Sequence, residues 1–64
     1  MCESAAYLKS GDEEELLMED VAMIKPTAEN KYVLHGLLGD SMELEGIIEA
    51  IDLMAHKIVF RKQL

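Results

Sequence analysis

Turn-forming residues divide this chain into short segments, and that division limits its fold more than any other feature of the sequence. Gly accepts positive φ angles and Asp hydrogen-bonds its own backbone, so clusters of such residues favour turns. Turns are predicted at residues 10–12, 27–30, 36–40 and 54–56. Helix nucleation is unfavourable in segments as short as those that remain, so the pattern favours short strands.

Three segments have clear strand patterns. Residues 31–35 are rich in the β-branched and aromatic side chains that pleated sheets favour, and they predict a central strand. Residues 41–45 alternate apolar with polar side chains, which predicts a half-buried strand. Residues 57–61 alternate in the same way, so we expect Ile58 and Phe60 to point inward and this strand to pair with the one before it.

Two further segments, 13–25 and 46–53, also fit helices, the first by residue propensity and the second by the spacing of its apolar side chains. We predict strands in both. Alternation and the missing backbone donor of Pro26 favour two short strands in the first, broken near residues 19–20. Gly and turn residues on either side leave the second too short for a stable helix. Residues 3–8 are predicted as the first strand.

The length of the chain sets its architecture. With 64 residues it can close only one small hydrophobic core, so residues 1–64 are predicted to form a single domain. Five or six short strands with tight turns predict an all-β fold, and closing the sheet would leave no exposed edge. We therefore expect a small SH3-like antiparallel β barrel.

The charge of the chain disfavours some partners. Thirteen Asp and Glu residues against six Lys and Arg residues give a net charge of −7, which repels nucleic acids and anionic lipids. The acidic run at residues 12–15 is predicted to be a solvated turn, because it lacks the spacing of a calcium loop. No signal peptide and no apolar run of about 20 residues is recognised, so we expect no membrane span and a cytoplasmic location. A lone thiol stays reduced there.

Cys2 is the residue with the most distinctive chemistry. Its thiolate and its own backbone nitrogen can form a five-membered chelate, and removal of Met1 would make that nitrogen a free amine. Ni²⁺ and Cu²⁺ accept such N,S donor sets in a square plane. A two-fold dimer would supply two further donors, which predicts one metal ion per two chains. The alternative is that Cys2 is an ordinary residue at a chain end.

Other side chains give weaker signals. His35 and His56 are candidate ligands, but each is more simply explained as a hydrogen-bonded histidine in a turn or at a strand end. The five methionines are predicted to fill the core. No phosphate loop, nucleophile elbow or acid–base pair is present in the sequence, so we expect no enzymatic activity.

Several short motifs, in their order along the chain, resemble the CooT family of small nickel-binding proteins. They are residues 1–8 (MCESAAYL), 18–21 (MEDV), 44–46 (LEG), 51–53 (IDL) and 56–59 (HKIV). The resemblance implies an SH3-like barrel, a homodimer, and Ni(II) bound by the cysteine at position two of each chain. It also implies a role in supplying nickel to carbon monoxide dehydrogenase. Cys2 receives the ligand role, and the adjoining backbone at Glu3 is a second candidate donor.

The resulting hypothesis is a nickel-binding accessory protein, acting as a metallochaperone or a nickel store. Delivery, storage and sensing of the metal, and Ni(II) against Cu(II) or Zn(II), remain open alternatives at this point. Members of the family have also been described as RNA-binding, which the net charge of −7 disfavours. The second hypothesis is therefore a metal-free β-barrel module that binds a protein or RNA.

Overall fold

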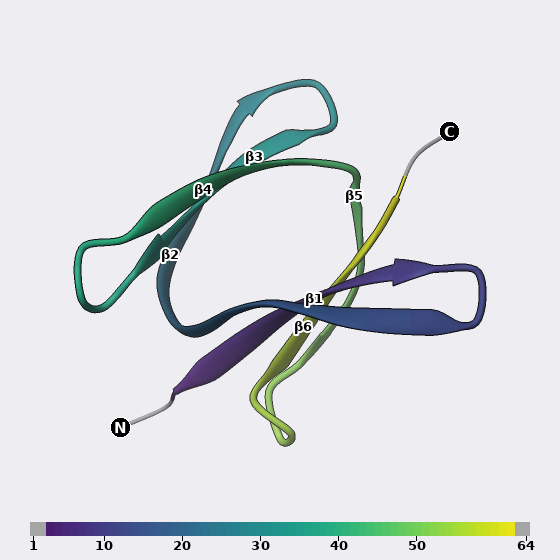
Figure 1. The fold of residues 1–64 in the computed structure, drawn as a ribbon, viewed down its shortest axis with the longest axis horizontal. Coiled ribbons are helices and arrows are strands. Elements are labelled where there is room, and N and C mark those ends of the chain that lie inside the picture. The colour runs from purple at the N-terminus through teal and green to yellow at the C-terminus, as the bar shows by residue number, and fades with distance from the viewer. Residues whose placement is uncertain (1–2, 63–64) are drawn as a thin grey trace.

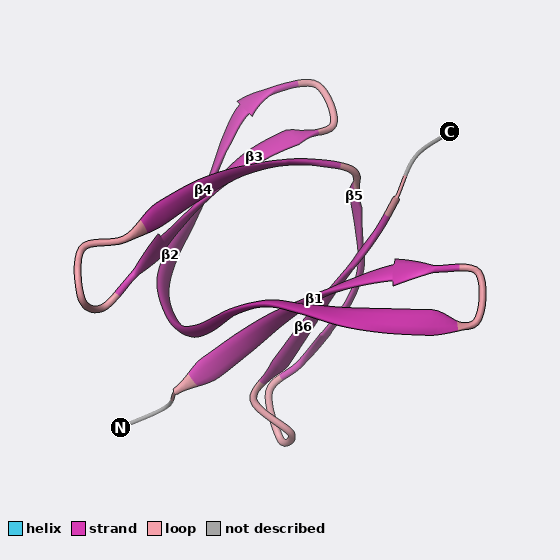
Figure 2. Cartoon of the chain, viewed as in Figure 1, coloured by secondary structure: helices cyan, strands magenta, loops and turns pink. Residues whose placement is uncertain are grey.

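The computed structural model describes residues 3–62, which form one six-stranded sheet and no helix (Figures 1 and 2). The strands are β1 (Ser4–Ser10), β2 (Glu13–Ala28), β3 (Lys31–Gly36), β4 (Ser41–Glu45), β5 (Ile47–Asp52) and β6 (Lys57–Arg61). This confirms the all-β class. Accordingly, the described part of the chain contains no helix long and apolar enough to cross a membrane.

The strand order is β4-β3-β2-β1-β6-β5. Four of the neighbouring pairs are antiparallel, as predicted, but β1 and β6 are parallel over residues 5–9 and 57–61. Parallel neighbours need a crossover connection, and here all the strands from β2 to β5 lie between the two in sequence. The chain thus brings its last strand beside its first, in the same direction.

The prediction of two short strands in residues 13–25 was wrong, because β2 runs unbroken for 16 residues. It bends instead of ending. Its register with β1 shifts on both sides of Ala6, and Asp20 has a φ of 54°, in the left-handed region. The first half of β2 pairs with β1 and the second half with β3, where Pro26 lies opposite Tyr32. The chain therefore bends at a bulged corner within β2, where we predicted that one strand ends and the next begins.

The sheet curls around the core but does not close by hydrogen bonding. Figure 1 shows the strands surrounding an oval, with β2, β4, β5 and β6 on its successive sides. The edge strands β4 and β5 are not paired with each other. They are joined by Gly46, whose N–H donates to the Asn30 carbonyl at 2.8 Å. The predicted closed barrel is therefore an open, curled sheet in the residues described.

The core is small. Its buried side chains are Ala6, Met18, Leu34, Leu44, Ile58, Val59 and Phe60. Phe60 and Leu34 are the largest that are fully buried, and the Phe60 ring lies 5.5 Å from that of Tyr32. The inward orientation predicted for Ile58 and Phe60 is confirmed.

The prediction that the methionines fill the core was wrong for two of those described. Met18 is buried, but Met23 is 55% exposed and Met54 is 92% exposed. Met54 follows β5 in a turn, where no strand covers it. Met23 lies opposite His35 on β2, next to Ile24, which packs against the core. Because successive strand residues point to opposite faces, Met23 points outward.

Candidate functional site

The start of β1 lies between two turns at one end of the sheet. Ser4 pairs with Val21, and Val21 pairs with Gly36 at the end of β3. On the other side, the Ala5 N–H donates to the His56 carbonyl at 3.0 Å. Because neighbouring strands are about 4.8 Å apart, both turns begin within about 10 Å of the start of β1. Figure 1 shows the same arrangement, and we call residues 3–5, 20–21, 36–40 and 52–56 the N-terminal end of the sheet.

Backbone hydrogen bonds hold the β3–β4 turn against the corner of β2. The Leu37 N–H donates to the Asp20 carbonyl at 3.0 Å, and the Gly36 N–H donates to the Asp40 carbonyl at 2.8 Å. Gly39 has a φ of 94°, which suits glycine and few other residues. The left-handed corner at Asp20 therefore positions both the start of β1 and the turn beside it.

A carboxylate holds the β5–β6 turn. Asp52 Oδ1 accepts hydrogen bonds from the N–H groups of Met54 at 3.1 Å and Ala55 at 3.0 Å. Asp side chains commonly stabilise turns in this way. The turn ends at His56, whose φ of 54° directs the chain back into β6. The carbonyl that anchors Ala5 is thus fixed by a defined turn.

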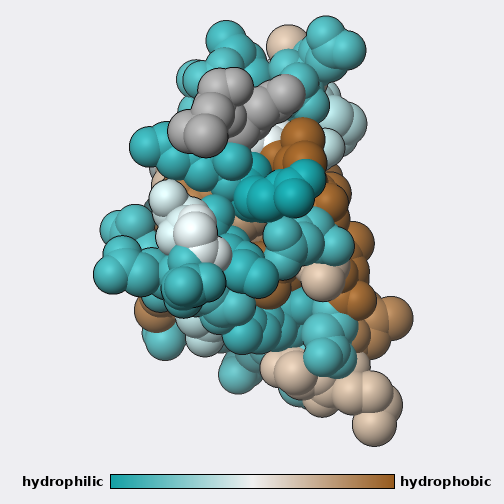
Figure 3. Space-filling view, turned by 90° about the vertical axis from the view of Figure 1, so that its right-hand side faces the viewer, coloured by the Kyte–Doolittle hydropathy of each residue, from teal (hydrophilic) through white to brown (hydrophobic). Residues whose placement is uncertain are grey.

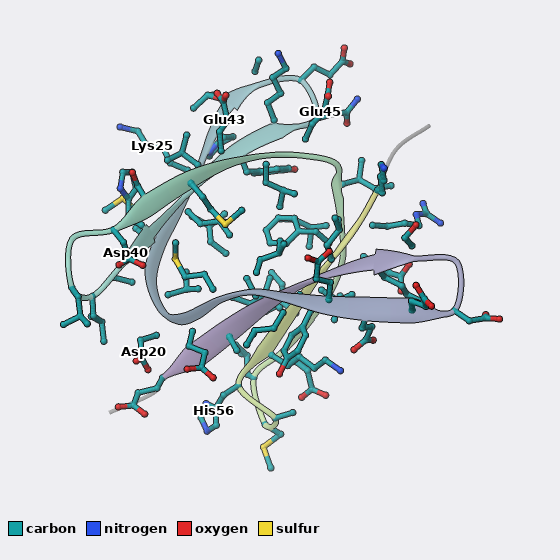
Figure 4. All side chains as sticks on the ribbon, in the orientation of Figure 1. Asp20, Lys25, Asp40, Glu43, Glu45 and His56 are labelled. Atoms are coloured by element: carbon teal, nitrogen blue, oxygen red, sulfur yellow. The ribbon has the colours of Figure 1, made fainter. Side chains whose placement is uncertain are left out.

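Of the two residues predicted to bind metal, Glu3 alone lies among the residues that the structure describes. Cys2 lies outside the described residues. Glu3 is described, is exposed to solvent and immediately precedes β1. Figure 4 shows Asp20 and His56 near the start of β1, one on each side of it. Asp40, in the β3–β4 turn, is also labelled there.

The two histidines are not brought together. His35 lies on β3 opposite Met23 and Ser41, whereas His56 precedes β6, and β2 and β1 separate those strands. Within residues 3–62, no group of three or more His, Cys, Asp or Glu side chains is arranged to hold a metal ion.

The acidic run lies at the other end of β1. Glu13, Glu14 and Glu15 line an open depression of about 510 Å³ together with Leu8 and Ser10. Lys57 Nζ forms an ion pair with Glu14 Oε1 at 2.7 Å. The hydrogen bond that Lys57 donates in this pair raises the pKa of Lys57 above its ordinary value of 10.5. Among the described residues of this acidic run, an ion pair is formed by Glu14.

Sequence reasoning missed the Lys57 contacts. Lys57 Nζ also lies 4.9 Å from the centre of the Tyr7 ring, so one cation contacts residues of both β1 and β2. These contacts follow from the parallel pairing of β1 with β6. No local pattern in the sequence indicates that pairing.

A second missed feature is a set of apolar side chains in the two turns. Leu37 and Leu38 in the β3–β4 turn are 54% and 94% exposed, and Leu53 and Met54 in the β5–β6 turn are 78% and 92% exposed. The available signal was Leu37 and Leu38 inside one predicted turn and Met54 at the start of another, where polar residues are usual.

Comparisons with known proteins agree with the geometry. The family model described as CO dehydrogenase accessory protein CooT matches residues 1–61. A crystal structure described as a CooT from Carboxydothermus hydrogenoformans superposes with a TM-score of 0.88 at 30% sequence identity. The match covers 98% of this chain and 100% of that chain. No curated protein matches the chain.

Proposed function

The chain belongs to the CooT family of CO dehydrogenase accessory proteins, and from this premise we propose that it is a non-enzymatic carrier that binds Ni(II) through Cys2. The observation that carries the proposal is the fixed position of the chain just after Cys2. Ala5 is bonded to His56 at 3.0 Å, and Ser4 is paired with Val21. The start of β1, two residues after Cys2 in the sequence, is therefore held by pairing on both sides.

The donor chemistry supports nickel. The Cys2 thiolate, its own nitrogen and the backbone nitrogen of Glu3 are the N and S donors that Ni²⁺ accepts in square-planar sites. The thiolate and one of the two nitrogens make two donors from one chain, whereas a square-planar site has four positions. A two-fold dimer presents the same donors twice, so we propose a homodimer that shares one Ni(II) ion.

Membership of the family supports CO dehydrogenase as the recipient of the ion. An accessory protein of CO dehydrogenase that holds Ni(II) would deliver it to that enzyme or store it for that use. We further propose a cytoplasmic location, because the ligand thiol must remain reduced to bind the ion. A metal-free interaction module is the second candidate, favoured by the exposed Leu38 and Met54.

An anaerobic Ni²⁺ titration of the reduced protein tests the proposal, followed by visible absorption and calorimetry. Saturation is expected near one ion per two chains, with thiolate-to-nickel absorption that disappears in Cys2→Ser. Equal binding by Cys2→Ser, or no binding by the wild type, would contradict the proposal and favour the metal-free module.

A matched variant separates the backbone role of His56 from a ligand role. His56→Gly removes the imidazole, and glycine adopts the φ of 54° at this position without strain. The turn and its bond to Ala5 should persist. We expect this variant to retain nickel affinity; loss of affinity with an unchanged circular dichroism spectrum would add the imidazole to the donor set.

A further inference from the structure

One edge of β5 is unpaired in the part of the chain that the structure describes. Within residues 3–62, β5 pairs with β6 and stands at the end of the strand order β4-β3-β2-β1-β6-β5. A strand in this position presents a row of N–H and C=O groups to which another extended chain can add. We call the side of β5 that faces away from β6 the open edge.

The backbone of Ile51 points toward the open edge. The His56 carbonyl accepts a hydrogen bond from Ala5 of β1, and successive strand residues direct their N–H and C=O groups to opposite sides. Val59, three residues later, therefore directs its groups toward β5, where it lies opposite Ala50. The groups of Ala50 thus face β6, and those of Ile51, the next residue, face away from it.

Two apolar side chains of β5 belong to incompletely covered layers of the core. Ile48 lies opposite Phe60 and Ile51 lies opposite Ile58, and directly opposed residues of an antiparallel pair share a face. Phe60 and Ile58 are buried, whereas Ile48 and Ile51 are 37% and 55% exposed. Among the described strands, none lies beyond β5 to cover them. A further strand with inward apolar side chains would complete both layers.

The other edge strand, β4, is protected in a way that β5 is not. Its exposed residues Glu43 and Glu45, labelled in Figure 4, alternate with Met42 and Leu44, which pack in the core. Charged side chains on an edge strand discourage pairing with another chain. Figure 3 shows the side of the molecule on which β5 lies in Figure 1, and there the hydrophobic atoms form a band along one edge. The open edge of β5 is therefore the more receptive of the two.

The charged residues of β5 limit the kind of partner. The carboxylate oxygens of Glu49 lie 3.3 Å from Lys9 Nζ and 3.9 Å from Arg61 Nε. These cations stand on β1 and β6, so Glu49 is drawn away from the open edge. Asp52, at the end of β5, is also acidic, and the chain carries a net charge of −7. A segment with lysine or arginine is therefore favoured over an acidic one.

We propose that the open edge of β5 binds an extended segment of a different protein, which adds to the sheet as a further strand. The segment alternates apolar residues, which pack beside Ile48 and Ile51, with polar residues that include lysine or arginine. Strand addition obtains affinity from main-chain hydrogen bonds and specificity from alternate side chains. The role of this contact rests on the proposed function, because it gives the recipient of the ion a place to dock; the edge itself is defined without the metal.

A second copy of this chain at the open edge is incompatible with a shared ion. Ala50 lies opposite Val59, and Val59 lies opposite Tyr7 of β1. Two β5 strands paired about a two-fold axis would therefore place each Ser4, two strands away and three residues before Tyr7, roughly 15 Å from that axis. The two residues that separate Ser4 from Cys2 span at most about 7 Å. The open edge is therefore left for a different protein.

A synthetic peptide that alternates valine with lysine is the probe, and calorimetry with the reduced, metal-free chain measures its binding. Ile51→Lys is the edge variant, because an inward-pointing charge on an edge strand opposes pairing. We expect it to raise the dissociation constant of the peptide about 10-fold or more. A peptide that alternates valine with glutamate should bind more weakly than the lysine peptide.

Met23→Lys is the matched control. Met23 has the same exposed fraction as Ile51, 55%, and gains the same charge, but it lies opposite His35 on a strand paired on both sides. This variant should change the dissociation constant by less than about 3-fold. Circular dichroism verifies the fold of both variants. No binding of the lysine peptide up to about 1 mM, or equal weakening by the two variants, would overturn the proposal.

Hydrogen exchange at single amides tests the geometry. In the free chain the Ile51 N–H should exchange faster than that of Ala50, which faces β6. The peptide should slow exchange at Ile51 about 10-fold or more and leave Ala50 little changed. Binding without protection of Ile51 would overturn strand addition. Protection of Ile51 that grows with chain concentration in the absence of peptide would show that a second copy occupies the edge, and would also overturn the proposal.

Cys2→Ser separates this contact from the proposed function. The variant should bind the peptide with wild-type affinity and bind no nickel, which supports both statements. Nickel binding that is independent of Cys2, together with protection of Ile51 by the peptide, contradicts only the proposed function. Nickel binding that depends on Cys2, with Ile51 unprotected by the peptide, contradicts only the docking at the open edge.

Discussion

Phe60 should be the most sensitive position in the core. It is fully buried on β6, between Leu8 of β1 and Ile48 of β5, and its ring contacts that of Tyr32. Replacing a buried Phe with Ala typically lowers the free energy of unfolding by about 3–5 kcal/mol. A domain of 64 residues has a total of roughly 3–10 kcal/mol. Phe60→Ala should therefore leave the chain largely unfolded or close to it.

Phe60→Leu gives a measurable intermediate. It keeps an apolar side chain but loses the aromatic contact, worth about 0.5–1.5 kcal/mol, and some packing. We expect a loss of about 2 kcal/mol, which corresponds to a fall in Tm of roughly 8–16 °C for a domain of this size. Urea unfolding followed by circular dichroism measures it, at one fixed protein concentration because dimerisation affects the midpoint.

The control for this series is Leu16→Ala, at a 45% exposed position. It should change the free energy of unfolding by no more than about 0.5 kcal/mol. If Phe60→Leu changed stability as little as the control, the assignment of Phe60 to the centre of the core would be refuted.

Two further positions give independent tests. In Gly46→Ala the new Cβ would lie 2.7 Å from the Arg61 carbonyl oxygen, so we expect a loss of roughly 1–3 kcal/mol in urea unfolding; an unchanged midpoint would show that the link between the edge strands is not tight. The pKa of Lys57 is raised by its hydrogen bond to Glu14, so its contribution to stability is complete below pH 10.5 and is lost as the pH rises through the higher folded value. Melts between pH 9 and 12 should therefore show a steeper decline for the wild type than for Lys57→Met, and parallel curves would contradict the assignment.

Local features of the fold were predictable from the sequence. The strands predicted at residues 31–35, 41–45 and 57–61 correspond to β3, β4 and β6 with at most one residue of difference. Each of these segments shows a strand pattern in its side chains and has turn-forming residues beside it. Both signals extend over only a few residues. The inward orientation of Phe60 follows from the same period.

Long-range features were not predictable. The parallel pairing of β1 with β6 and the open edges of β4 and β5 depend on how distant segments meet. The continuity of β2 depends on Asp20, which adopts a left-handed φ that Asp tolerates but does not require. Sequence alone could not tell a bulged corner at that residue from the end of a strand.

The candidate site was only partly predictable. Cys2 was predicted as a ligand from the chemistry of its thiolate, without reference to the fold, and because it lies outside the described residues this stays a prediction. The apolar turns beside β1 were not found, because methionine was assigned to the core by default and Leu38 lies between glycines that indicated only a turn. That both turns lie beside the start of β1 follows only from the strand pairing and from the hydrogen bond of Ala5 to His56.

A core this small has consequences for how the chain could carry a metal. Within residues 3–62, Phe60 and Leu34 are the largest fully buried side chains, and no group of three or more His, Cys, Asp or Glu side chains is arranged to hold a metal ion. A site shared between two chains needs no internal cavity, because each chain contributes its start. By thermodynamic linkage, the factor by which a shared ion raises the affinity between the two chains equals the factor by which dimerisation raises the affinity for nickel. Weakening the contact between the two chains of the proposed dimer should therefore also weaken nickel binding, and a recipient that separates the chains would promote release of the ion without any chemical change at Cys2.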